Sequence, residues 1–279
     1  MHKIMQASLL WLQLGALLAY LGVTWQEYRR VRLQRVPTRR QLLPLGTLAV
    51  ALHGAALFPQ LILPSGALNL NLGLSLSLFA WIVALVLLIA SAWRPLAILG
   101  LGVMPTAAVV LLGQALFSGG PTVPIRVTDN PLLFGHILVS TTAYALLTLA
   151  AGQGVLLWIQ DRSLRLKRFG PSFRLLPPLQ DMEEVLFQII WTGFVLLSLS
   201  LLSATLFADR IFGRPFVWDH HTVLSLVAWL VFAILLLGRA RWGWRARTAV
   251  GWTLSGYGII LLAYFGVKIV LEFILQRPS

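Results

Sequence analysis

The stretch NLGLSLSLFAWIVALVLLIASAW, residues 71–93, contains 23 residues and no charged side chain. About 20 apolar residues in a helix are enough to cross the hydrocarbon core of a bilayer. Arg94 and Pro95 end this run, and further apolar runs of similar length fill most of the chain. Only 11% of the residues are charged and 58% are hydrophobic, whereas a soluble domain has roughly a quarter charged residues. The sequence therefore predicts an all-α, polytopic membrane protein.

About eight runs are long enough to span the membrane. We expect transmembrane helices over residues 5–25, 42–63, 71–93, 96–117, 132–159, 185–208, 222–238 and 250–275. The first run lacks a small-residue cleavage site, so we expect it to be retained as a helix. No internal repeat or soluble segment is visible, and we expect residues 1–279 to form a single integral membrane domain.

The positive charges predict the orientation. The formal net charge is +13, and the arginines fall in short clusters between alternate apolar runs, at residues 29–40, 162–174 and 239–247. Loops rich in Lys and Arg lie on the cytoplasmic side of a membrane. This predicts that both termini lie outside, and it explains the basic charge by contact with the bilayer rather than with nucleic acid.

The chain contains no cysteine. Disulfides, thiolate metal sites and covalent haem attachment through CxxCH are therefore excluded. Any cofactor must be held by His, Met, carboxylate or backbone groups.

The predicted topology places His136, His220 and His221 at the outer face, at the ends of two different helices. A neutral imidazole offers one lone pair to a metal while its other nitrogen is held by a neighbour. Three histidines on one face favour a ligand site, although histidines are also tolerated where water is near. His53 lies near the middle of its run, where a polar group needs a partner. It is either an axial ligand or hydrogen-bonded to another helix.

The outer loop at residues 212–222, FGRPFVWDHHT, joins aromatic residues to two of these histidines. Phe212, Phe216 and Trp218 could stack on the faces of a planar cofactor. The alternative is an interfacial anchor, which aromatic residues often form at a membrane surface.

Other polar residues have simpler interpretations. Lys268 and Glu272 are four residues apart and share a helix face, where they pair or reach the interface, or else form an ion or proton path. Glu183 and Glu184 begin a predicted helix, whose dipole favours negative charge. Asn71 either caps its helix or lines an outer pocket.

The outer loop resembles the tryptophan-rich loop of the cytochrome c assembly proteins, WGxxWxWDPKE, and aligns with it without a gap. Gly213, Trp218 and Asp219 match the pattern, while Phe212 and Phe216 replace two tryptophans. The resemblance extends over residues 71–268, within an assembly-like core of about 71–275. Further matches are Asn71, Ser75, His136, Ser140, Tyr144, Gly193, Phe194, Trp229, Gly243, Trp244, Arg245 and the YFGV of residues 264–267.

Two departures from the family pattern concern the ligands. His220, His221 and Thr222 stand where the family has Pro-Lys-Glu, and Leu237 replaces the histidine of an LHxR element. The segments LPPLQDMEEVLF and GRARWGWRARTA are most similar to the divergent YpjD-like inner-membrane subgroup.

The resemblance implies a haem-binding or haem-handling protein of the bacterial inner membrane, involved in cytochrome c-type biogenesis and catalysing no bond-making of its own. It implies non-covalent haem b, and His136 looks like the first external haem histidine of the family. Leu237 stands in place of the second external ligand, and we expect His220 or His221 to hold the iron with His136 instead. Trp218, Asp219, Phe212 and Phe216 would line or cover the site, and His53 would be a waystation in the membrane. Candidate partners are the lipid bilayer, haem, and other cytochrome assembly or membrane transport proteins.

Two other functions remain open on the residues alone. The chain could be an accessory subunit or modulator of a cation transport system, with His53, Lys268, Glu272 and the outer histidines as ion ligands. It could also be a membrane scaffold without a ligand.

Overall fold

The computed structural model describes residues 2–63, 67–69, 71–114, 125–126, 131–167, 175–208, 218 and 220–263, without the side chains of residues 2–6, 67, 125 and 126. The chain divides into two compact units, Met1–Thr128 (unit 1) and Asp129–Ser279 (unit 2). The single membrane domain expected over residues 1–279 stays a prediction.

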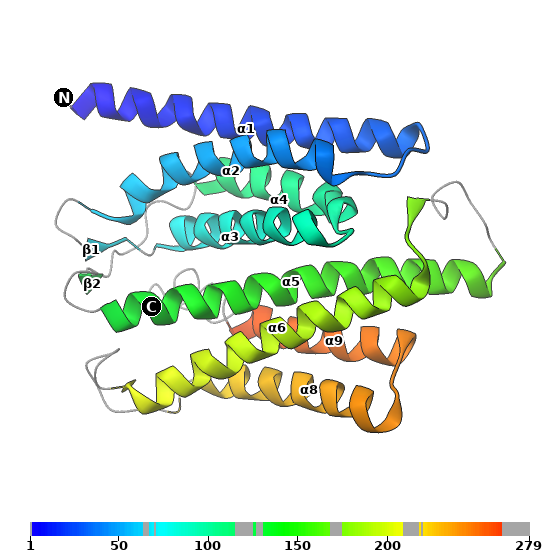
Figure 1. The fold of residues 1–279 in the computed structure, drawn as a ribbon. Coiled ribbons are helices and arrows are strands. Elements are labelled where there is room, and N and C mark those ends of the chain that lie inside the picture. Colours follow the sequence, from blue (N-terminus) through cyan, green and yellow to red (C-terminus); the bar gives the residue numbers. More distant parts are fainter. Residues whose placement is uncertain are drawn as a thin grey trace. The chain divides into compact units, whose positions relative to one another are not determined.

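Unit 1 is a bundle of helices with a small strand pair. Helices α1 and α3 each pack against both α2 and α4 (Figure 1). One face of each helix is therefore turned toward the interior of the unit. The elements are α1 (His2–Arg32), α2 (Arg39–Leu61), β1 (Ala67–Leu68), α3 (Leu72–Trp93), the 3-10 helix η1 (Ala97–Leu99), α4 (Gly100–Gly113) and β2 (Ile125–Arg126).

The strand pair joins the segment that follows α2 to the segment that precedes α5. β1 and β2 are antiparallel, with Ala67 opposite Arg126 and Leu68 opposite Ile125. Leu68 also forms a bridge with Ile62, directly after α2. The two segments are thus held together at the outer end of unit 1.

Unit 2 is a second helical bundle. Helix α5 packs against α6 and α9, and α8 packs against the same two helices. Gly193 allows the close approach of α6 to α5, because a Cβ at this position would lie 2.9 Å from Cδ2 of Leu147. The elements are α5 (Pro131–Arg165), α6 (Leu179–Leu206), α8 (His220–Trp242) and α9 (Ala246–Leu261).

Six helices in the described residues are long and apolar enough to cross a membrane: α1, α2, α3, α5, α6 and α8. The apolar helix over Ala97–Gly113 is shorter, and α9 is described over 16 residues. The protein is therefore an all-α polytopic membrane protein, as the sequence predicts, with β1 and β2 as a small addition. The predicted end of the last span, near residue 275, lies outside the described residues.

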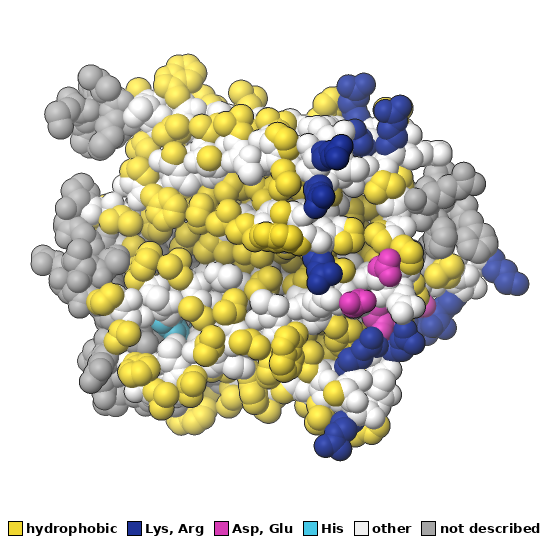
Figure 2. Space-filling view, viewed as in Figure 1, with side chains coloured by type: hydrophobic (Ala, Val, Ile, Leu, Met, Phe, Trp, Pro, Cys, Tyr) yellow, Lys and Arg dark blue, Asp and Glu magenta, His cyan; other side chains and the backbone are white. Residues whose placement is uncertain are grey.

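Basic side chains gather at one end of each unit (Figure 2). In unit 1 they occupy the end of α1, the connection to α2 and the start of α2, and in unit 2 they end α5 and surround the turn from α8 to α9. Under the positive-inside rule this is the cytoplasmic end, here called the inner end. The first turns of α5 and α8 consequently lie at the outer end of unit 2.

Two helices continue beyond the apolar runs that predicted them. α1 ends at Arg32 rather than near residue 25, and α5 ends at Arg165 rather than near residue 159. Gln34 and Lys167, two residues after these ends, have positive φ values of 55° and 52°. A left-handed residue commonly terminates a helix, so backbone conformation rather than loss of hydrophobicity sets these ends.

Candidate functional site

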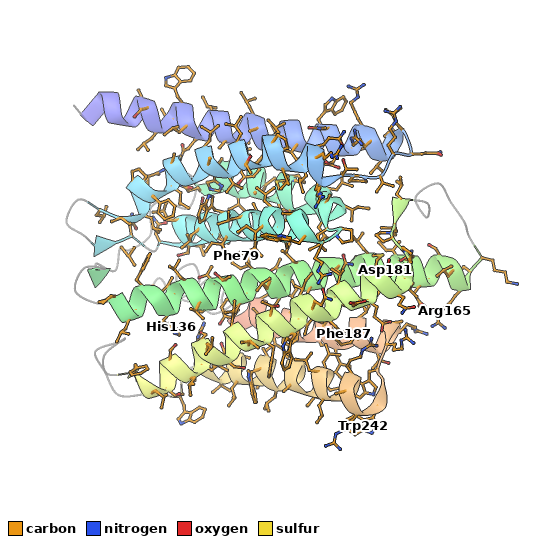
Figure 3. The ribbon with its side chains drawn as sticks, viewed as in Figure 1. Phe79, His136, Arg165, Asp181, Phe187 and Trp242 are labelled. Carbon is orange, nitrogen blue, oxygen red and sulfur yellow. The ribbon has the colours of Figure 1, made fainter. Side chains whose placement is uncertain are left out.

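His136 stands in the second turn of α5, at the outer end of unit 2 (Figure 3). Its Nδ1 atom lies 2.9 Å from Oγ of Ser203 on α6. The Ser203 hydroxyl donates its single proton to the carbonyl oxygen of Ser200, at 2.8 Å. It must therefore accept a hydrogen bond from Nδ1–H of His136. In the neutral ring the lone pair is then on Nε2, an arrangement that metal-ligating histidines use.

His221 is the second histidine at this end of unit 2. It is partly buried at the start of α8 and lies close enough to His136 for an electrostatic interaction. His220 is exposed, as expected for its neighbour in a helix, where consecutive side chains point about 100° apart. Of the two histidines predicted as partners of His136, the structure brings His221 toward it.

The aromatic cover predicted for the site is described only in part. Trp218 is 66% exposed. Phe212, Phe216 and Asp219 lie outside the described residues, so their contribution stays a prediction.

An aromatic stack lies deeper in unit 2. The rings of Phe194 and Trp229 are stacked with centroids 5.4 Å apart, and Trp191 lies 6.2 Å from Phe194. Trp229 Nε1 donates to Oγ of Ser198 at 2.8 Å. The stack fixes α8 against α6 on the inner side of the histidines.

Hydroxyl groups are the site residues that sequence reasoning missed. Ser203 orients His136, and Oγ of Ser225 on α8 lies 3.3 Å from the hydroxyl of Tyr144 on α5. A signal was available in α6, where Ser198, Ser200 and Ser203 interrupt an apolar helix. Polar side chains inside a membrane span usually have partners on neighbouring helices.

His53 has a different environment in unit 1. It is fully buried in α2, with Nδ1 3.0 Å from the hydroxyl of Tyr20 on α1 and Nε2 2.9 Å from Oγ of Ser77 on α3. Both ring nitrogens are thus used within the protein. Of the two alternatives for His53, the structure shows the hydrogen-bonded one. Its role as an iron ligand stays a prediction that requires one of these bonds to break.

Glu183 joins three elements at the inner end of unit 2. Its buried carboxylate accepts hydrogen bonds from Arg239, from Nε of Arg245 at 3.2 Å and from the backbone N–H of Ala246 at 3.3 Å. The Arg239 guanidinium also lies 4.6 Å from the ring centroid of Phe187. The structural role expected for Glu183 thus comes from ion pairs with the end of α8 and the start of α9. α6 begins four residues before it, at Leu179.

Of the remaining predicted residues, Asn71 has a defined role in the structure, and Lys268 and Glu272 are not described. Asn71 caps α3, because its side chain accepts from the backbone N–H of Leu74 at 2.8 Å. Lys268 and Glu272 lie outside the described residues. Within the described residues, no group of three His, Asp or Glu side chains is arranged to hold a metal ion.

A family profile and several related proteins match this chain. A sequence profile described as Cytochrome C assembly protein matches residues 44–275. The inner membrane protein YpjD of Escherichia coli K12 is 32% identical over 239 residues, covering 85% of this chain and 88% of that protein. An uncharacterized 28.8 kDa protein of Azospirillum brasilense is 32% identical over 276 residues, covering 94% of this chain and 97% of its own length.

A third relative is similar to this chain over about a third of its length. The cytochrome c biogenesis protein CcsA of Thermosynechococcus vestitus is 28% identical over 91 residues, or 33% of this chain and 28% of that protein. No solved structure matches this chain. The family profile covers most of the chain, and the two longer relatives match it over nearly their whole length. This multi-pass inner-membrane protein therefore belongs to the cytochrome c assembly protein family.

Proposed function

We propose that this protein binds haem non-covalently at the outer end of unit 2 and takes part in the biogenesis of c-type cytochromes. The observation that carries this proposal is the hydrogen bond that holds His136 as the Nδ1–H tautomer, with His221 nearby. Family membership and the partial similarity to CcsA, a cytochrome c biogenesis protein, support the same function.

The described residues fit a haem ligand. Ser203 keeps the proton on Nδ1 of His136, so Nε2 carries the lone pair that would face iron. His221 adds a second imidazole at the same end of unit 2. Haem would supply an iron atom that binds such nitrogens. The protein's own part is to bind and orient the cofactor, and the proposal includes no catalysed bond-making.

The test is an optical spectrum of the purified protein after expression with added haem. We expect a Soret band in the wild type and its loss in a His136→Ala/His221→Ala double variant. His220→Ala is the matched control, because this exposed histidine stands next to His221 on the same helix turn. It should retain the band. A wild type without a Soret band, or a double variant with an unchanged one, contradicts the proposal.

The cation-transport alternative predicts a different composition for the same preparation. Haem would be absent and a stoichiometric metal ion would be present. Measuring haem and metal content on one sample therefore separates the two functions.

A further inference from the structure

Glu27 is an acidic side chain buried in unit 1, near the inner end of α1. Its exposed fraction is 0%, and neither carboxylate oxygen has a hydrogen-bond partner in the described residues. The other described acidic side chains differ from it. Asp161 and Glu183 form ion pairs, whereas Asp181 and Glu184 are exposed. Glu27 is therefore the described carboxyl group for which neither water nor a donor compensates a negative charge.

The inner end of unit 1 is tightly packed with apolar groups. A Cβ at Gly22 would lie 3.0 Å from Leu45, and a Cβ at Gly100 would lie 3.0 Å from Leu42. Leu42, on α2, is itself fully buried beside Gly100 at the start of α4. Such packing leaves little room for the waters that would otherwise solvate a carboxylate.

Positive side chains on α1 and α2 lie near the inner end of unit 1, and Arg30 among them is partly buried. Arg30, one turn further along α1, interacts with Glu27 electrostatically, but the described residues show no ion pair between them. On α2, Arg39 and Arg40 are exposed, and Arg39 donates to the carbonyl oxygen of Ala92 at 2.6 Å. The α4 sequence, GLGVMPTAAVVLLG, has no titratable side chain. His53, the other titratable group of α2, is bonded to Tyr20 and Ser77.

An isolated carboxylate in an apolar interior is so unfavourable that such groups normally become neutral. A hard metal cation would need six or more oxygen ligands, and the described chain shows no acidic or histidine cluster that could hold a metal ion. A proton needs a single carboxylate oxygen. We propose that Glu27 is a proton-binding site, which holds a proton in the membrane-embedded protein.

Glu27 lies on the same face of α1 as Tyr20, another buried polar residue. Tyr20 and Glu27 are seven residues apart and therefore lie on the same face of α1, about 10 Å apart along the axis. Tyr20 begins the hydrogen-bonded series through His53 to Ser77. The proton site thus lies about two helical turns from this series, toward the inner end of α1. It is independent of the haem site proposed in unit 2.

Two measurements on the full-length protein test the proposal. N,N′-dicyclohexylcarbodiimide is apolar and reacts with protonated carboxyl groups: the O–H adds across one C=N bond, and the product rearranges to a stable N-acylurea. We expect mass spectrometry to find this adduct on Glu27 and not on Glu183, whose carboxylate accepts hydrogen bonds from Arg239, Arg245 and Ala246. Infrared spectroscopy should show a protonated carboxyl band in the wild type.

Variants give each measurement a control. Glu27→Gln, which keeps the shape of the side chain, should lose both the adduct and the infrared band. Glu183→Gln should keep both. Arg30→Gln should leave the labelling of Glu27 unchanged or increase it. The positive charge of Arg30 favours the ionised form of Glu27, and the substitution removes that charge. The proposal is overturned if Glu27→Gln keeps both the adduct and the infrared band. It is also overturned if the wild type shows neither of them. A Glu27 adduct that forms only in Arg30→Gln would also overturn it, by showing an ionised Glu27 compensated by Arg30.

Discussion

His53 in unit 1 and His136 in unit 2 are both histidines on membrane-spanning helices, but the protein uses their rings differently. Hydroxyl groups of two neighbouring helices occupy both nitrogens of His53. In His136, Ser203 fixes Nδ1 and thereby places the lone pair on Nε2, close to a second histidine. The two rings differ in how they are held: hydroxyl groups on two helices hold His53, whereas Ser203 orients His136 on the side of unit 2 where His221 lies.

The largest effect on stability is expected from His53→Ala. The substitution leaves the hydroxyls of Tyr20 and Ser77 without the imidazole, and each buried polar group left unpaired costs about 1–3 kcal/mol. The cavity adds to this cost. Denaturant unfolding in detergent should show a lower midpoint than the wild type. An unchanged midpoint would mean that the three-helix hydrogen-bonded series does not stabilise unit 1.

Ser203→Ala is expected to have a smaller effect, which concerns the affinity for haem and not the stability of the fold. Without this acceptor, His136 is no longer held as the Nδ1–H tautomer. Loss of such an outer hydrogen bond typically lowers the affinity of a site about 10–100-fold. Ser203→Thr keeps the hydroxyl and should restore most of the affinity in a haem titration. If the threonine variant binds as weakly as the alanine variant, Ser203 does not act through its hydrogen bond.

The smallest effect is expected from Tyr20→Phe. The ring remains in edge contact with His53, at a centroid distance of 5.7 Å, but Nδ1 loses its partner. The free energy of unfolding should fall by about 1 kcal/mol. Tyr28→Phe is the matched control on the same helix, because Tyr28 is 43% exposed and water can replace the exposed hydrogen bond that its hydroxyl accepts from Arg32. Equal effects of the two variants would contradict the assigned hydrogen bond.

Much of the fold could be predicted because hydrophobicity is a local property. The apolar runs identified the spans, and the arginine clusters identified the inner end of each unit. The ends of α1 and α5 could not be predicted, because they depend on left-handed conformations at Gln34 and Lys167, which are not typical residues for such positions. The strand pair was missed because β1 and β2 come from distant segments of only two residues each.

The candidate site shows the same limit. Residue type and topology suggested His136, His220 and His221, but only the packed helices distinguish the partly buried His221 from the exposed His220. Ser203 is 67 residues from His136, and Arg239 is 56 residues from Glu183. Such pairs depend on which helix faces meet, and no spacing rule within a single helix can predict them.

The central claim is that His136, which Ser203 orients near a second histidine, holds haem, rather than the fully buried His53. The most direct test compares the haem-to-protein ratio of His136→Ala and His53→Ala, purified after expression with the same haem supply. We predict that His136→Ala loses haem, whereas His53→Ala is less stable but retains a ratio close to that of the wild type. Loss of haem from His53→Ala together with its retention in His136→Ala would contradict the claim.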